Sequence, residues 1–139
     1  MNINFEEFVF RNDDDLEIIN DANWIITTRK HDLALMTEGE KTIIHILRLV
    51  GEVGNGGFEQ YFYNTQGQFL PETLDALERI NDSNVKSLFQ KAVICFNSDK
   101  VETLKEEEWY KLDKQFYNYD MYLYKLMVKY IRDNIEQFV

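Results

Sequence analysis

The chain has 139 residues, a formal net charge of −10 and a single cysteine, and 45% of its residues are hydrophobic. This composition predicts one globular domain, and one cysteine excludes a disulfide within the chain. The negative charge argues against direct nucleic-acid binding, because phosphates are bound mainly by Lys and Arg. We expect a soluble cytoplasmic protein without a membrane span, since no segment resembles a signal peptide or approaches the ~18 apolar residues of a spanning helix.

Helical spacing of apolar residues runs through most of the chain, starting near the N-terminus. Residues 2–11 suit either an extended arm or a short helix. Residues 13–30 predict a helix capped by one of three successive aspartates, with its apolar stripe formed by Leu16, Ile19 and Ile26 and widened by Trp24. The next helix is predicted to begin at Thr37.

Thr37 and Glu40 have the spacing of a capping box, in which each residue satisfies a backbone N–H of the other. The helix that follows is predicted to end at Gly54 or Asn55. Its predicted apolar face consists of Ile43, Ile44, Leu47 and Val50.

The second half of the chain continues the helical pattern. Pro71 favours a helix start near residue 70, and Asp82 or Ser83 is expected to cap the next helix. The stretch from residue 101 to the C-terminus is long for one helix, and we predict a break near Asn118. The sequence therefore predicts an all-α, single-domain bundle of six or seven helices with short connections.

A glycine-rich stretch, GEVGNGGFEQYFYNTQG (residues 51–67), precedes a group of aromatic residues. Gly54, Gly56 and Gly57 can adopt positive φ angles, so the chain can turn tightly there. Three rings follow on one helical face: Phe58, Tyr61 and Phe62. The free N–H groups at the start of this second helix need acceptors, which Glu52, Asn55 or an anionic ligand would supply.

No set of residues in the chain indicates catalysis. His31 and His45 are the only histidines and lack the spacing of zinc ligands, so we predict neither a metal nor a cofactor, and no enzymatic activity. Cys95 lies between apolar neighbours and is expected to be a buried, reduced thiol. The acidic run at residues 106–108 is interpreted as a solvated helix face.

Acidic residues are concentrated at the start of the chain, where seven carboxylates face one base, Arg11, within the first 28 residues. Such a field attracts basic partners and speeds their encounter. The alternative is that the acids only keep a small protein soluble. The predicted partner-binding surface consists of Glu6, Glu7, Asp13, Asp14, Asp15, Glu17 and Asp21.

The glycine–aromatic stretch resembles a motif of a bacterial family of small all-helical proteins, whose best-known member is described as a DNA mimic. The resembling residues are Asn55, Gly56, Gly57, Phe58, Gln60, Tyr61, Phe62 and Asn64, together with residues 72–80 and, in a later segment, Leu112, Asp113, Phe116 and Tyr117. The resemblance covers roughly residues 37–138. It implies a helical core there, preceded by an acidic arm and helix at residues 1–36.

In the described member, acidic side chains are arranged like duplex phosphates and occupy the DNA-binding face of a transcription factor. The resemblance therefore implies an acidic protein-interaction module whose partner is basic, for example a regulator or a nuclease. The motif itself is interpreted as fold-specifying: Gly56 and Gly57 make the turn, the rings pack, and Gln60 and Asn64 bond to backbone ends.

Two alternatives remain open from the sequence. One is an immunity or antitoxin role, which differs from DNA mimicry only in the partner. The other is a small-molecule site at the corner, lined by polar side chains that include Glu52, Asn55, Gln60, Tyr61 and Asn64. The oligomeric state, monomer or dimer, is also open.

Overall fold

The computed structural model describes residues 4–139, and the regular secondary structure in this part of the chain is all helical, with no strand. The prediction of an all-α bundle of six or seven helices is confirmed, since seven α-helices are present in the described residues. They are α1 (Phe5–Arg11), α2 (Asp15–Arg29), α3 (Glu38–Thr65), α4 (Leu70–Arg79), α5 (Ser83–Phe96), α6 (Glu102–Phe116) and α7 (Asp120–Asp133), with short 3₁₀ turns at Leu33–Leu35 and Ile135–Gln137.

Short polar side chains begin four of these helices by accepting an N–H of the first turn. They are Asn4, Asp14, Thr37 and Asp82, and the capping box between Thr37 and Glu40 forms as predicted. Residues 5–11 form a helix, so the helical alternative holds for this part of the N-terminal segment. Residues 2 and 3 of that segment lie outside the described residues.

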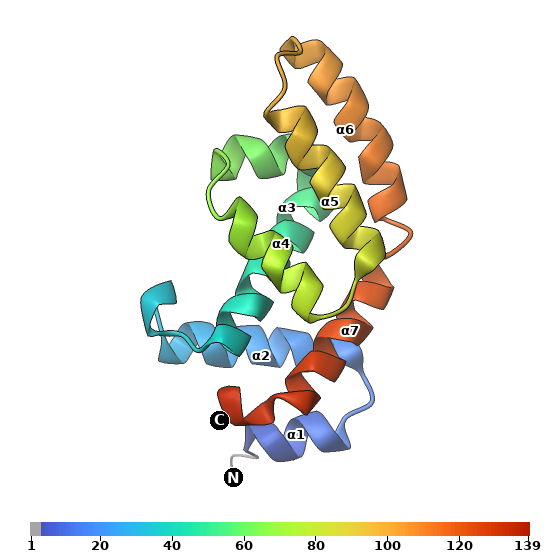
Figure 1. Cartoon of the computed structure of the whole chain (residues 1–139). Coiled ribbons are helices and arrows are strands. Elements are labelled where there is room, and N and C mark those ends of the chain that lie inside the picture. The colour runs from blue at the N-terminus through green and yellow to red at the C-terminus, as the bar shows by residue number, and fades with distance from the viewer. Residues whose placement is uncertain (1–3) are drawn as a thin grey trace.

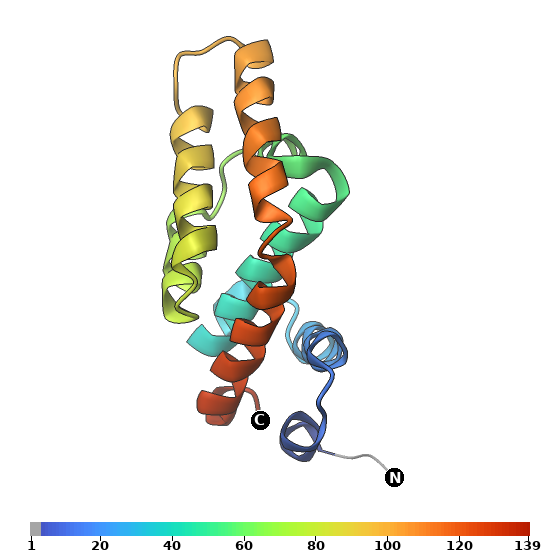
Figure 2. The same cartoon turned by 90° about the vertical axis from the view of Figure 1, so that its right-hand side faces the viewer.

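The helices form an elongated body with α3 at its centre (Figures 1 and 2). Helices α4, α5 and α6 surround α3 at one end, while α1, α2 and α7 gather at the other. The break predicted near Asn118 separates α6 from α7, which lets the two helices contribute to opposite ends. No helix within residues 4–139 combines the length and the apolar character that crossing a bilayer requires.

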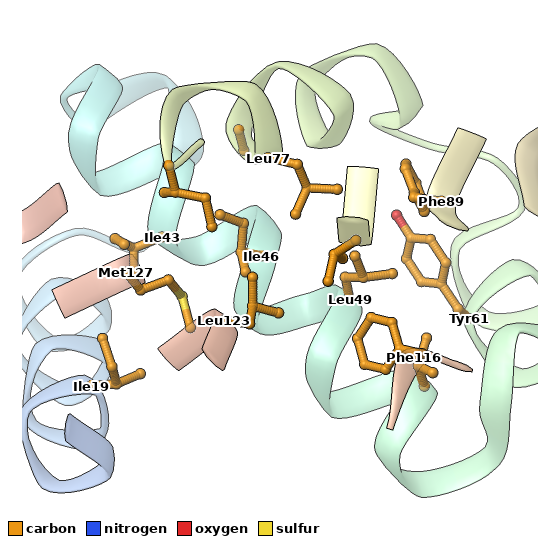
Figure 3. Close-up of a cluster of buried hydrophobic side chains, with 14 of the residues drawn as sticks. Ile19, Ile43, Ile46, Leu49, Tyr61, Leu77, Phe89, Phe116, Leu123 and Met127 are labelled. Atoms are coloured by element: carbon orange, nitrogen blue, oxygen red, sulfur yellow. The ribbon is translucent and has the colours of Figure 1, made fainter. Parts of the chain in front are cut away.

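The hydrophobic core runs through the whole length of this body. In Figure 3 it extends from Ile19 on α2, past Ile46 on α3, to Phe116 on α6. The fully buried stripe of α3 differs from the predicted one and consists of Ile43, Ile46, Leu49 and Val53. The difference arises because helices pack on both sides of α3. The other predicted residues of that face, Ile44, Leu47 and Val50, are only half-buried.

The apolar stripe predicted for α2 was wider than the face that α2 buries. Ile18, Ile19 and Ile26 are buried, whereas Leu16 is 43% exposed and Trp24 is 66% exposed. Helix α2 packs against the rest of the protein along one narrow face, so it can bury only the residues in the centre of its apolar stripe.

One arginine attaches α1 to the body. Arg132 on α7 donates from Nη2 to the backbone oxygens of Val9 and Asn12, at 2.9 Å each, and from Nε to Val9 O at 3.2 Å. These carbonyls belong to the last turn of α1 and the residue after it, where no further turn supplies N–H donors. The guanidinium therefore caps α1 from outside the helix.

We predict that Arg132→Met loosens α1. The free energy of unfolding should fall by about 1–3 kcal/mol, because hydrogen bonds from a charged donor are lost, and amide hydrogen exchange should speed up in residues 5–12. Lys129→Met is the matched control, since Lys129 lies on the same helix but forms only an exposed ion pair with Asp133. Equal exchange in the two variants would contradict the capping role.

Candidate functional site

The corner in α3 is made by two glycines within an otherwise helical stretch. The backbone leaves helical geometry at Gly56 (φ −150°, ψ 19°) and Gly57 (φ 76°, ψ −176°). Only Gly57 adopts a conformation that L side chains rarely reach, and a Cβ there would also collide with the carboxylate of Asp113. Gly54 lies in the first half of α3 with open space beside it. The backbone stays helical up to the residue before Gly56.

Asp113 on α6 caps the second half of α3. The N–H of Phe58 donates to Asp113 Oδ1 at 2.8 Å. The prediction that Glu52 or Asn55 accepts this bond is therefore wrong, because the acceptor comes from a distant helix. Burial raises the pKa of the Asp113 carboxyl above its ordinary value, and the bond from Phe58 partly offsets this effect.

The same face of α6 also satisfies the other side of the break. Tyr117 donates its hydroxyl to the carbonyl oxygen of Val53 at 3.1 Å, at the end of the first half of α3. Asp113 and Tyr117 are four residues apart, so they lie one turn apart on one helical face. Asp113 on α6 and Tyr117, the residue after α6, thus bond to an N–H after the break and to a carbonyl before it.

The rings that follow the corner are buried, which is the packing role predicted for them. Phe58 meets Phe116 edge-on, with ring centroids 5.8 Å apart. Tyr61 lies 5.6 Å from Phe89 on α5. The rings therefore attach the second half of α3 to both α5 and α6.

A polar network on the outer side of the corner joins the two halves of α3. The Glu52 carboxylate accepts from Gln60 Nε2 at 3.0 Å and from Asn64 Nδ2 at 2.6 Å. Asn55 Nδ2 donates to Gln60 Oε1 at 3.1 Å. Arg48 Nε lies 3.5 Å from Glu52 Oε1. The donors from Asn64 and Gln60 hold the pKa of Glu52 below its ordinary value.

This network differs from the prediction in two respects. Gln60 and Asn64 bond to a carboxylate and not to backbone ends. Tyr61 is buried against Phe89 and does not join the four polar side chains that were predicted to share a pocket with it. Because Glu52, Gln60 and Asn64 bond to one another, they brace the corner.

The acids predicted as a partner-binding surface lie on α1, on α2 and on the connection between them. Five of the seven are exposed, while Asp15 and Asp21 are half-buried. Within residues 4–139, only Glu7 among them lies within 4.0 Å of a cation, Arg11. Burial and the charge of Glu17 raise the pKa of Asp21. Apart from the Glu7–Arg11 pair, the acids of this surface have no cation within 4.0 Å in residues 4–139.

A second group of acids, which the sequence interpretation missed, lies at the α6 end of the molecule. We call Glu59, Glu102 and Glu106 the rim acids. The charge of Glu59 is the main reason why the pKa of Glu106 is raised. No ion pair involves any of the three in the described part of the chain. The acidic run at residues 106–108 is thus not simply a solvated face, because Glu106 meets Glu59 of another helix.

The histidine and the cysteine considered for chemistry lie in separate surroundings. His45 is buried beside the Phe69 ring, with ring centroids 5.2 Å apart, and burial lowers the pKa of its imidazole. Cys95 is buried near Lys105 O, and burial raises the pKa of its thiol to about 11. Such a thiol carries almost no thiolate near neutral pH, in agreement with the predicted inert cysteine.

A family model described as DMP19-like protein matches residues 34–134. The chain belongs to this family. The match confirms the resemblance to DNA-mimic proteins and is consistent with a protein of that kind. Searches of curated proteins and of solved structures gave no significant match.

The DMP19-like region contains the corner, its cap Asp113 and all three rim acids. It begins after α2, so the seven acids on α1, α2 and their connection lie before it. The family match therefore supports the helical core directly, whereas the N-terminal acids are a feature of this chain beyond the matched region.

We predict that the corner requires glycine at position 57 and a carboxylate at position 113. Gly57→Ala should lower the free energy of unfolding by about 1–3 kcal/mol because of backbone strain and the collision with Asp113. Asp113→Ala should lower the free energy of unfolding by about 1–3 kcal/mol, because it leaves the Phe58 N–H without a partner. Urea unfolding measures both effects.

Gly54→Ala is the matched control for the glycine variant. It places alanine in a helix with open space around it and should raise the free energy of unfolding by up to about 1 kcal/mol. If Gly57→Ala and Gly54→Ala proved equally stable, the corner would not depend on the conformation at residue 57.

Proposed function

We propose that the protein is a non-enzymatic, acidic interaction module that occupies the DNA-binding face of a basic protein. Family membership supports the class. The observation that carries the proposal is the N-terminal acidic surface, in which six of seven carboxylates have no cation within 4.0 Å in residues 4–139. We place this activity in the bacterial cytoplasm, where DNA-binding regulators act.

Charge complementarity explains how such a surface would compete with DNA. Duplex DNA presents about one charge per 1.7 Å of its axis, and Lys and Arg side chains bind those phosphates. Exposed carboxylates on two helices and their acidic connection offer acceptors to the same side chains. Because α1 is held by Arg132 and α2 packs on the core, the acids are displayed on a fixed scaffold, which lowers the entropic cost of binding.

An immunity or antitoxin role would use the same surface on a toxin in place of a regulator. The two roles share the physical requirement of a basic, nucleic-acid-binding face on the partner. The corner is assigned to scaffolding, because its polar side chains bond to one another and to the backbone break.

The proposal predicts that duplex DNA displaces the partner. The immobilised protein is incubated with lysate of the source bacterium at about 50 mM salt, and bound proteins are eluted with excess duplex DNA or with 200 mM salt. A basic protein should elute under both conditions. Its affinity for the immobilised protein should fall about tenfold or more between 50 and 200 mM salt, because salt screens exposed charges. Capture that neither DNA nor salt affects would contradict the proposal.

Charge variants locate the surface in the same assay. The triple variant Glu6→Gln, Asp13→Asn and Glu17→Gln should lose most of the captured partner. The control removes equal charge from exposed acids elsewhere, with Glu72→Gln, Asp75→Asn and Asp99→Asn, and should retain it. Asp14 is left unchanged because it caps α2.

A further inference from the structure

A cavity of about 330 Å³ lies between the end of α2, the connection that follows it, the first half of α3 and the residue before α4. Sites for small ligands usually span about 300–1,000 Å³, so its volume suits a small molecule. Its apolar lining comes from Leu33, Met36, Ile44 and Phe69. None of the lining residues is acidic, although the chain carries a net charge of −10. The cavity therefore favours a ligand that has an apolar part and no positive charge.

His45 on α3 borders this cavity and has no hydrogen-bond partner in the fold. The residue is only 8% exposed, yet its imidazole makes no hydrogen bond within residues 4–139. Buried polar groups nearly always have such a bond. Burial lowers the pKa of the imidazole, so near neutral pH the ring is uncharged and offers one N–H donor and one acceptor. His45 thus has a hydrogen-bonding capacity that the fold leaves unused.

A second, smaller cavity of about 100 Å³ also borders His45. Its volume leaves room for only a few water molecules, each of which occupies about 30 Å³ in the liquid. Its lining includes the carboxylates of Glu38, Glu72 and Asp75, which would repel an anion. The larger cavity is therefore the place where His45 can bond to a ligand.

Arg48 adds a positive charge to the larger cavity. It lies three residues after His45, so the two side chains share one face of α3, and both line the cavity. Its ion pair in the described chain joins Nε to Glu52 Oε1 at 3.5 Å. Glu52 also accepts from Gln60 and Asn64, so the guanidinium can turn to a ligand without leaving that carboxylate unpartnered.

Phe69 is held in an uncommon backbone conformation beside His45. Its φ of 64° and ψ of 30° lie in the left-handed region, which bulky residues rarely adopt. Its ring lies 5.2 Å from the His45 ring, yet the residue remains 39% exposed. Backbone strain of this kind is concentrated at functional sites. Here it places an exposed apolar ring next to an imidazole without a partner.

We propose that this cavity binds a small carboxylic acid with an apolar body. The carboxylate accepts hydrogen bonds from Arg48 and His45, and the body packs against the apolar lining. A cationic ligand would meet Arg48 and Lys30 without a carboxylate in the lining to compensate its charge. The cavity uses none of the acids of the proposed partner surface, so this inference does not depend on the proposed function.

The test uses phenylacetate as the probe and phenylacetamide as its neutral isostere. Binding is followed by the NMR signals of methionine methyl groups, since Met36 lines the cavity and Met121 lies exposed on α7. Phenylacetate should shift the Met36 signal in a saturable way and leave the Met121 signal unchanged. Phenylacetamide should bind about tenfold more weakly or worse, because charge-assisted hydrogen bonds are lost. No saturable shift at Met36, or equal affinity for the two compounds, would overturn the proposal.

A charge variant separates specific binding from general attraction of anions. Arg48→Met should weaken phenylacetate binding by about tenfold or more, because the charged donor is removed. Lys91→Met removes the same charge from an exposed position on α5 and should leave the affinity unchanged. Equal weakening in both variants would show nonspecific attraction and overturn the proposal.

A second variant separates ligand binding by His45 from a packing role. His45→Leu should leave the melting temperature unchanged or raise it, because a buried polar group without a hydrogen bond is unfavourable for the fold. The same variant should weaken phenylacetate binding by about fivefold or more, since one hydrogen bond to the carboxylate is lost. A lower melting temperature with unchanged affinity would show that His45 only packs in the fold, and the proposal would be wrong.

Discussion

The hydrogen bond from the Phe58 N–H to the Asp113 carboxylate is the contact on which the arrangement of the α6 end depends. A helix that breaks inside a protein exposes a carbonyl and an N–H that need partners, and each unmet group costs about 1–3 kcal/mol. Asp113 on α6 and Tyr117, the residue after α6, bond to an N–H after the break and to a carbonyl before it. Gly57 allows the close approach because it has no Cβ. The bend in α3 and the position of α6 are therefore determined together.

This constraint divides α3 into two parts with different tasks. The first half packs its aliphatic residues against α2, α4 and α7, while the second half places its rings against α5 and α6 (Figure 3). The network of Glu52, Gln60 and Asn64 braces the outer side of the bend. Because α6 is attached at the corner, Glu59 meets Glu106 across the two helices. The same contact that stabilises the bend thus brings acids of two helices together.

The two acidic regions lie at opposite ends of the body (Figures 1 and 2). The N-terminal acids are carried by α1 and α2, and the rim acids by α3 and α6. A partner that binds DNA along an extended basic face has cations distributed over a comparable length, because the duplex itself is a long, evenly charged ligand. A rigid helical body with acids at both ends fits such a face better than a single acidic loop would.

Local interactions made much of the fold predictable from sequence. The capping box at Thr37, the proline at residue 71 and the break near Asn118 depend on neighbours within a few residues, and each lies where the pattern indicated. Asp113 was noticed in a segment resembling the family, but its role was not predictable, because the bond to Phe58 joins residues 55 positions apart. Helix orientation decides such contacts, and spacing along the chain does not reveal it.

The same limit explains the errors in the candidate site. The glycines and rings were predictable because a tight turn and a shared helical face are local properties. The partners of Gln60 and Asn64 were not, because a bend of unknown angle decides whether Glu52 or the backbone lies within reach. The meeting of Glu59 with Glu106 was likewise hidden, since each acid looks solvated on its own helix.

Native-state hydrogen exchange at the Phe58 amide tests the central claim most directly. If Asp113 caps this N–H, the amide should exchange as slowly as buried amides in the centre of α3, such as that of Ile46, because it opens only when the corner unfolds. The first-turn amides of α4 provide the reference for an uncapped start, since that helix has no side-chain cap. Exchange of Phe58 as fast as those amides would contradict the account.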